Sequence, residues 1–381
     1  MSKLSNVSCY VTEKISVDSI DISEYITTDN LLQNKKGRVI AEKLPTQKVT
    51  RFKKNDILIA NIRPYLKKIW QADIDGGASS DVLVVRPNDV IDYNFLYYAL
   101  TQDSFFEYVM KGSKGTKMPR GDKSQIMNFV IPDLEIDEQI KIGKLLKSID
   151  QKIQINNQIN QELEAMAKTL YDYWFVQFDF PDQNGKPYKS SGGKMVYNPE
   201  LKREIPEGWG VESVGNLLDK VTKAEKIENN SIEFIGEIPV IDQSQKYIAG
   251  FTNNENALLQ PQNGHVIFGD HTRVVKYINF DYARGADGTQ VLISNNENIS
   301  NVLLYHMIED FDLSNYGYAR HFKFLKEKTV IVPDKEVSSK FETQANVIYE
   351  KIKNNIFENQ ELTQLRDWLL PMLMNGQVKV E

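Results

Sequence analysis

Arginines and lysines that lie beside glycines and aromatic residues in short loops have the clearest chemical potential in this chain. Residues 61–68 read Asn-Ile-Arg-Pro-Tyr-Leu-Lys-Lys after an apolar run, and residues 112–121 combine positive charges with three glycines. Glycines let a backbone approach phosphates closely, and an arginine can form two hydrogen bonds with one base edge. We therefore predict that these loops contact DNA through Arg63, Lys67, Lys68, Lys114, Lys117 and Arg120.

Two later loops have a related composition. Residues 269–273 read Gly-Asp-His-Thr-Arg and residues 316–321 read Tyr-Gly-Tyr-Ala-Arg-His. The predicted DNA contacts there are His271, Thr272, Arg273, Arg320 and His321. Arg63 matches Arg273 within a residue or so, and Arg120 matches Arg320 or His321. Solvated surface charge is the alternative for each of these residues.

The four loops match in pairs because the chain contains a long internal repeat. Asp81–Val84 resembles Gln290–Ile293 at a shift of 209, and Val130–Asp133 resembles Ile331–Asp334 at a shift of 201. Asn160–Leu163 recurs as Asn359–Leu362 at a shift of 199. A period this long indicates a duplicated domain with a duplicated connector. Asp81 and Asp287 are expected to orient neighbouring side chains rather than to bind a metal.

Apolar periodicity changes once within each half. Short apolar runs separated by Gly, Asn, Asp and Pro predict strands, and helical patterns follow at 137–174 and 339–370. Ser339 to Glu342 predicts a capping box, and Pro371 with Gly376 predicts the end of the second helix. The predicted fold is therefore mixed α/β (α+β), with two globular domains separated by two long antiparallel coiled-coil helices. The predicted boundaries are 1–131 for the first domain, 132–180 for the central helix, 181–205 for a linker, 206–332 for the second domain and 333–381 for the C-terminal helix.

A heptad seam is expected along both helices. In the first helix it has two rows, residues 142, 149, 156, 163 and 170, and residues 145, 152, 159, 166 and 173. In an antiparallel pair Asn156 falls opposite about Asn355, where two buried asparagines would fix the register; both being flank residues is an equal alternative. A helix over 137–174 is about 57 Å long at 1.5 Å per residue. The residues predicted for the seam and for subunit docking are Ile142, Ile149, Asn156, Leu163, Leu170, Ile348, Asn355, Leu362 and Leu369.

Composition and missing motifs exclude several classes of protein. The single cysteine, Cys9, excludes a disulfide scaffold, and the absence of a long apolar segment or an N-terminal leader predicts a cytoplasmic protein. No phosphate-binding loop or methyltransferase motif is present. Asp133 with Asp150 and Lys152 imitates a nuclease spacing, but Lys152 falls in the helical seam, and the four histidines lack ligand spacing. Net charge is −6, but residues 1–130 carry +4 and residues 206–332 carry −6, which favours the first domain as a polyanion binder.

The chain resembles the specificity subunit of type I restriction-modification systems over nearly its whole length. The most specific stretch runs from Leu170 through Tyr-Asp-Tyr-Trp-Phe-Val-Gln-Phe-Asp-Phe-Pro to Trp209 and is similar to the family's central conserved region. Arg366–Pro371 resembles the family's C-terminal end, and Phe268–Arg273 resembles one class of recognition domain. The sequence departs from the family pattern in the near absence of a separate N-terminal conserved segment. The pseudo-symmetric ring that the resemblance implies would therefore be closed mainly by the C-terminal tail.

The resemblance implies a non-catalytic DNA reader. Each recognition domain would read one half of a bipartite asymmetric target, and the helices would set the gap between the halves. Two modification (methyltransferase) subunits would dock along the helices and two restriction subunits would join them. No cofactor is expected on this chain; S-adenosylmethionine, ATP and Mg would be held by the partners. The alternative is a coiled-coil scaffold with two protein-binding globular domains, which would not explain the repeated arginine loops.

Overall fold

The computed structural model describes residues 1–219, 221, 224–317 and 320–381. The chain divides into two compact units. The first unit comprises Met1–Ile155 with Glu358–Glu381, and the second comprises Asn156–Phe357. Each unit therefore contains one globular domain and segments of both long helices.

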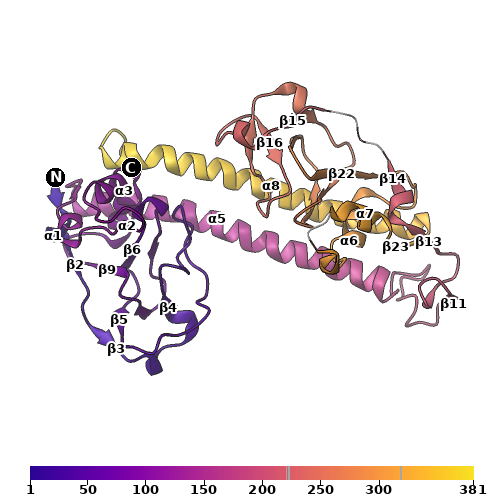
Figure 1. Ribbon diagram of the computed structural model, residues 1–381, viewed down its shortest axis with the longest axis horizontal. Coiled ribbons are helices and arrows are strands. Elements are labelled where there is room, and N and C mark those ends of the chain that lie inside the picture. Colours follow the sequence, from indigo (N-terminus) through magenta and orange to yellow (C-terminus); the bar gives the residue numbers. More distant parts are fainter. Residues whose placement is uncertain (220, 222–223, 318–319) are drawn as a thin grey trace. The chain divides into compact units, whose positions relative to one another are not determined.

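An antiparallel sheet in the order β2-β9-β6-β7 forms the centre of the first unit (Figure 1). Its strands are β2 (Ser8–Tyr10), β9 (Val82–Pro87), β6 (Ile57–Ala60) and β7 (Ile69–Gln71). A second sheet in the order β3-β5-β8-β4 contains β3 (Lys14–Ile15), β5 (Val49–Phe52), β8 (Gly76–Ala78) and β4 (Tyr25–Ile26). A third pairing joins β1 (Ser2–Lys3) to β10 (Val130–Ile131). The helices of this domain are α1 (Leu4–Val7), α2 (Tyr93–Thr101), α3 (Asp103–Lys111) and α4 (Lys123–Ile126).

Alternation along β6 explains why the central sheet is covered on both faces. Successive side chains of a strand point to opposite faces. Ile57 and Ile59 pack with α2 and α3, whereas Leu58 and Ala60 pack against the second sheet with Phe52. The first unit therefore has three layers, helices on one face of the central sheet and the second sheet on the other.

The second unit repeats this arrangement. Its central sheet has the order β14-β22-β19-β20, formed by β14 (Leu218–Asp219), β22 (Thr289–Ser294), β19 (His265–Gly269) and β20 (Val275–Ile278). The second sheet contains β15 (Lys226–Ile227), β21 (Tyr282–Gly285), β16 (Ile238–Ile241), β17 (Gly250–Thr252) and β18 (Leu258–Leu259). The remaining pairs are β11 (Met195–Asn198) with β12 (Arg203–Pro206), and β13 (Gly210–Ser213) with β23 (Thr329–Val332). The helices are α6 (Asn301–Ile308) and α7 (His321–Lys326).

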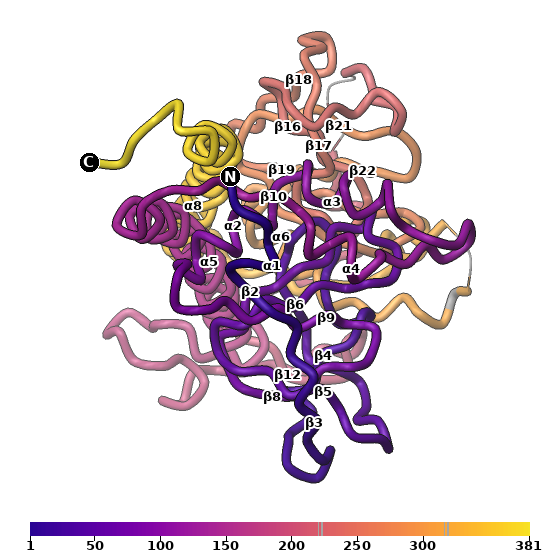
Figure 2. The backbone as a smooth tube through the Cα atoms, turned by 90° about the vertical axis from the view of Figure 1, so that its left-hand side faces the viewer, coloured from indigo at the N-terminus to yellow at the C-terminus, as the bar shows by residue number. Residues whose placement is uncertain are grey.

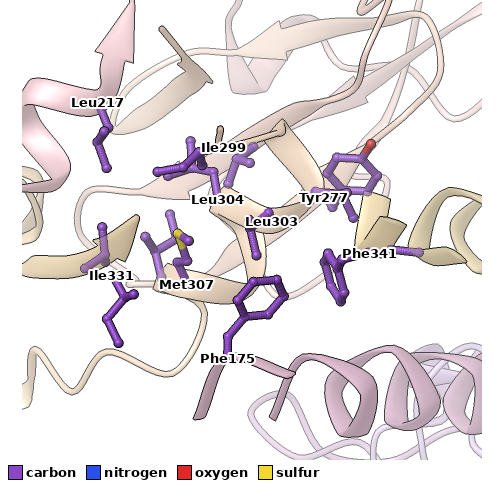
Figure 3. Close-up of a cluster of buried hydrophobic side chains, with 14 of the residues drawn as sticks. Phe175, Leu217, Tyr277, Ile299, Leu303, Leu304, Met307, Ile331 and Phe341 are labelled. Carbon is purple, nitrogen blue, oxygen red and sulfur yellow. The ribbon is translucent and has the colours of Figure 1, made fainter. Parts of the chain in front are cut away.

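Apolar side chains from distant parts of the sequence form the core of the second unit (Figure 3). Leu303 and Met307 of α6 meet Phe175 and Phe341 in this core. The aromatic run after residue 170 contributes further buried rings, with Phe180 stacked on Trp209 at a centroid distance of 5.0 Å. The run on which the family resemblance rests is therefore structural rather than ligand-binding.

Two long helices are present, with ends that differ from the prediction. α5 spans Ile136–Tyr171 and continues as a π-helical turn over Asp172–Val176, and α8 spans Lys335–Met374. The capping box at Ser339 is wrong, because Asp334 caps α8: its carboxylate accepts from the Val337 amide at 2.8 Å. Pro371 does not end α8 either, since the helix continues to Met374; Gly376, with a φ of +69°, forms the left-handed turn after it.

Within each unit the two helical segments run antiparallel. In the first unit Asp150 bonds to Arg366 at 2.8 Å and Lys152 pairs with Glu358 at 3.4 Å. In the second unit Asn355 donates to Asn160 at 2.8 Å. The predicted partner of Asn355, Asn156, is therefore corrected to Asn160, one helical turn farther along.

One of the two predicted rows of α5 is also wrong. Lys152 and Met166 are 50% and 58% exposed, because the buried row runs through Leu146, Asn160 and Ala167 instead. In the row at 142, Ile142, Ile149 and Asn156 are buried, and Leu163 and Leu170 are partly buried. The predicted seam residues of α8, Ile348, Asn355, Leu362 and Leu369, are buried or partly buried.

The C-terminal end of the chain packs into the first unit. Leu370, Leu373 and Met374 join the core formed by α2, α3 and the central sheet. The Lys141 ammonium donates to the Val380 carbonyl at 3.4 Å. The end of α8 thus lies beside the start of α5 (Figure 2). The first domain is therefore stabilised by residues from both ends of the sequence.

Candidate nucleic-acid interface

The candidate site of the first unit begins where β6 ends. The Asn61 amide donates to the Asp81 carbonyl at 2.9 Å, and the Asn61 carbonyl accepts from the Gly121 amide at 3.2 Å. Arg63, two residues later, has a φ of +52° and donates its amide to the Pro119 carbonyl at 2.8 Å. The backbone thus joins the two basic loops that the sequence separates by about fifty residues.

Arg120 is the most constrained of the predicted contact residues. Its amide and carbonyl both bond to Lys114 at 3.0 Å, which closes the glycine-containing loop into a narrow hairpin. Its guanidinium pairs with the Asp81 carboxylate at 2.9 Å while 56% of the side chain is exposed. The orienting role predicted for Asp81 is confirmed. An arginine held by one carboxylate edge still presents free N–H groups to a ligand.

The lysines around these arginines differ in availability. Lys114 and Lys117 lie on the exposed hairpin, and the Lys114 ammonium is 3.4 Å from Asp122. Lys67 pairs with Asp103 at 2.9 Å. Lys68 donates its ammonium to the Thr28 carbonyl, and burial lowers the pKa of this lysine. Lys68 is partly buried, and its ammonium is engaged with the loop that follows β4, so it is less available to a ligand than Lys114 or Lys117.

The second unit repeats this arrangement of backbone bonds, in which the residue after the central strand joins two loops; we call it the frame. The Asp270 amide donates to the Gly288 carbonyl at 2.7 Å, and the Asp270 carbonyl accepts from the His321 amide at 2.9 Å. Asp270 follows β19 just as Asn61 follows β6, so His321 corresponds to Gly121 and Arg320 corresponds to Arg120. Arg273, with a φ of +64°, corresponds to the left-handed Arg63 within one residue. Arg273 and Arg320 are both exposed.

The frame also corrects one alignment. Gly288, not Gln290, takes the place of Asp81, because the carbonyl of each accepts from the amide of the residue that follows the central strand. Arg320 therefore has no carboxylate at the position that orients Arg120. Asp287, the neighbour of Gly288, accepts a hydrogen bond through its backbone carbonyl from the Gln243 amide group at 2.9 Å.

Gln243 is a residue that the sequence reasoning missed. Its side-chain oxygen accepts from the His271 amide at 3.1 Å, and its carbonyl accepts from the Thr272 hydroxyl at 2.6 Å. Gln243 thereby holds the loop that carries His271, Thr272 and Arg273. The sequence signal was a polar run, Asp242 to Gln245, directly after a fully buried strand.

His321 is the one predicted contact residue that the structure buries. It is 3% exposed, and its Nδ1 lies 2.9 Å from the Asp270 carbonyl. The prediction for His321 is therefore corrected: this side chain anchors α7 under the loop. Tyr318 and Ala319 of the same loop lie outside the described residues.

Lys276, on β20, is a second lysine that holds a loop; strand register places it at the position of Trp70, two residues beyond that of Lys68. It is buried, and it donates to the Asp242 carbonyl at 2.8 Å and lies 3.8 Å from the Asp242 carboxylate. Burial lowers the pKa of Lys276 to about 8, and the Asp242 charge partly opposes that change. In each unit, therefore, a lysine of this edge of the central sheet, Lys68 before β7 or Lys276 on β20, holds a loop that follows a strand of the second sheet.

Other chemistry finds little support in the described part of the chain. No group of three or more His, Cys, Asp or Glu side chains suited to a metal ion occurs among the described residues. Asp150 and Lys152, which imitate a nuclease spacing, lie on α5 and pair with Arg366 and Glu358. No described helix is long and apolar enough to span a membrane.

Comparison with known proteins finds one family model and several similar proteins. Residues 11–165 match the type I restriction modification DNA specificity domain. The type I restriction enzyme MjaIX specificity subunit of Methanocaldococcus jannaschii is 26% identical, over 78% of this chain and 72% of that protein. The HindI specificity subunit of Haemophilus influenzae is 23% identical over 98% of both chains.

Among solved structures, the type I restriction-modification S subunit from M. genitalium has a TM-score of 0.59 at 17% identity, covering 98% of this chain and 95% of that one. This likeness confirms the fold class. The resemblance to the specificity subunits of type I restriction-modification systems seen in the sequence is therefore supported by a family model over residues 11–165 and by relatives that extend over most of the chain.

Proposed function

We propose that each unit of this chain reads one half of a bipartite, asymmetric DNA target through the major groove. The observation that carries the proposal is the repeated frame, in which the end of the central strand fixes two arginine-bearing loops together. Arg63 and Arg120 form this pair in the first unit, and Arg273 and Arg320 form it in the second. Arginine bonded to a guanine edge is the commonest specific contact in the major groove.

The remaining predicted contacts divide by availability. Lys114 and Lys117 would neutralise phosphates, which positions the first unit on the duplex without selecting a sequence. His271 and Thr272 are exposed beside Arg273 and would contact DNA in the second half-site. The first domain would therefore depend on charge more than the second.

The long helices would dock the modification subunits. In the second unit α5 exposes an apolar row through Ile159, Met166 and Tyr173. In the first unit α8 exposes Leu365 and Trp368, and Leu365 corresponds to Met166 at the repeat shift of 199. Exposed apolar rows on adjoining helical turns are typical of protein interfaces. Equivalent rows support two modification subunits, one for each unit.

The complete assembly would contain two modification subunits and two restriction subunits, acting in the cytoplasm. S-adenosylmethionine, ATP and Mg would be bound by those partners, so this chain would contribute recognition and geometry only. The helices would set the length of the unread gap between the half-sites.

Methylation mapping tests the proposal. The chain would be co-expressed with the modification subunit of its own system in a methylation-free host, and the genomic DNA sequenced for N6-methyladenine. A single split motif, methylated in each half, is the expected result. A stable co-purified complex that methylates nothing would favour the coiled-coil scaffold, and its binding would then be insensitive to the salt that weakens phosphate contacts.

A further inference from the structure

A groove of about 410 Å³ lies in the first unit where the domain meets the start of α5. Its floor is formed by Val7, Ile91 and Ile131, all less than 10% exposed. Its edges are Val90 and Ile136, which are 62% and 43% exposed. Apolar side chains that remain this exposed beside a buried apolar floor mark an interaction surface.

Carboxylates surround this groove. Asp133 and Glu135 line it directly, and both are exposed. Asp137 and Glu138 follow in the first turn of α5, and the segment 128–140 contains no lysine or arginine. Among the described residues, the positive group that pairs with Asp133 is the N-terminal ammonium of Met1, at 3.5 Å, with 81% and 68% of the two side chains exposed. A partner for this groove must therefore combine apolar and basic groups.

The second unit closes the same place by itself. Pro333 and Asp334 correspond to Pro132 and Asp133, so Lys335 corresponds to Leu134. Lys335 pairs with Glu297, in the loop that corresponds to Val90, at 2.7 Å. The Asp334 carboxylate accepts from the Trp209 indole at 3.1 Å. In the second unit a salt bridge and an indole thus take the place of the open groove.

We infer that the acid-rimmed groove of the first unit docks a basic, amphipathic segment of the modification subunit, in addition to the helical docking rows. This inference rests on the proposed function, because it takes the modification subunit as the partner. Val90 and Ile136 would receive the apolar side chains of the segment, and Asp133 and Glu135 would receive its lysines or arginines. The contact belongs to the first unit alone, so it would distinguish the two modification subunits.

The second unit supplies the design for the test. Val90→Glu with Leu134→Lys places in the first unit the salt bridge that Glu297 and Lys335 already form in the second. Because Leu134 is partly buried, Val90→Glu alone is the second variant, at a position too exposed to affect folding. Val39→Glu is the matched control, an exposed valine of the same unit outside the groove. The full-length chain and purified modification subunit would be titrated by calorimetry at two salt concentrations.

Both groove variants are expected to weaken one of the two binding events by about tenfold or more, with the other event and the control unchanged. Asp133→Asn with Glu135→Gln should weaken the same event and reduce its dependence on salt. Unchanged affinity in all groove variants would overturn the inference and leave the proposed function intact. A wild-type chain that binds no modification subunit would overturn both.

Discussion

Replacement of Arg120 by alanine separates DNA reading from stability. The Arg120 guanidinium contacts Asp81 at 2.9 Å, and the two side chains are 56% and 35% exposed. Exposed ion pairs contribute about 0.2–1 kcal/mol to stability, so Arg120→Ala should leave the thermal midpoint of the chain nearly unchanged. The backbone bonds between Arg120 and Lys114 persist in this variant, which keeps the hairpin closed.

The expected loss in DNA discrimination is larger than the loss in stability. One arginine that reads a base contributes about 1–3 kcal/mol, or roughly a 5- to 150-fold preference at one position. Asp81→Asn keeps the charge of Arg120 but removes the carboxylate that orients it. This variant should therefore relax the same base position by a smaller factor.

Sequencing of methylated genomic DNA measures both effects together. Arg120→Ala should relax one position of one half-site and leave the other half-site as selective as in the wild type. A uniform loss of methylation across both halves would refute base reading by Arg120 and assign it to a phosphate. Arg120→Lys is the control, because lysine keeps the charge but lacks the planar fork that bonds to two atoms of one base.

Three further predictions concern stability. Asn355→Leu leaves the buried Asn160 side-chain oxygen without its donor and should lower the free energy of unfolding by about 1–3 kcal/mol. In urea unfolding, the double variant with Asn160→Leu should restore most of that loss. Additive losses in the double variant would contradict this pairing. Arg86→Leu removes both bonds to Asp56, which is 2% exposed, and should cost about 3–5 kcal/mol; a loss below about 1 kcal/mol would disprove the pairing. Burial lowers the pKa of His265 to about 4, so the unfolded chain takes up this proton more readily than the folded chain, and stability should fall as pH falls from about 6.5 to 4. His265→Gln should reduce that fall when the free energy of unfolding is compared at pH 7 and pH 5, and an identical fall would exclude the histidine.

The elements and their duplication could be predicted because they depend on local pattern. Apolar alternation places Ile57 and Ile59 on one face, and the repeat at a shift of 199 relates α5 to α8. The same shift also predicts the buried row of α5 that the heptad count missed. Applied to Ala345, Ile352 and Asn359, it gives residues 146, 153 and 160, which is the row that the structure buries in α5.

The contacts of the loops could not be predicted because they depend on tertiary hydrogen bonds. The burial of His321 follows from the Asp270 carbonyl, fifty-one residues away. The correct alignment of Gly288 with Asp81 follows from strand register. Ala60 pairs with Val82 and Gly269 pairs with Thr289, so the shift between the units is 209 for the first strand of the pair and 207 for the second. No local pattern reports either fact.

The two units share backbone hydrogen bonds around the central strand but differ in the side chains near the arginines. Both units keep the carbonyl that accepts at the end of the central strand and, within one residue, the left-handed arginine after it. They differ in the residues around the arginines. In the first unit Asp81 orients Arg120, whereas in the second unit Gly288 takes the position of Asp81 and Gln243 holds the loop that carries Arg273. A frame built from backbone bonds tolerates such replacement, because a carbonyl is present whatever the side chain. One duplicated scaffold can thereby present two different sets of side chains, which is what an asymmetric target requires of a chain with internal symmetry.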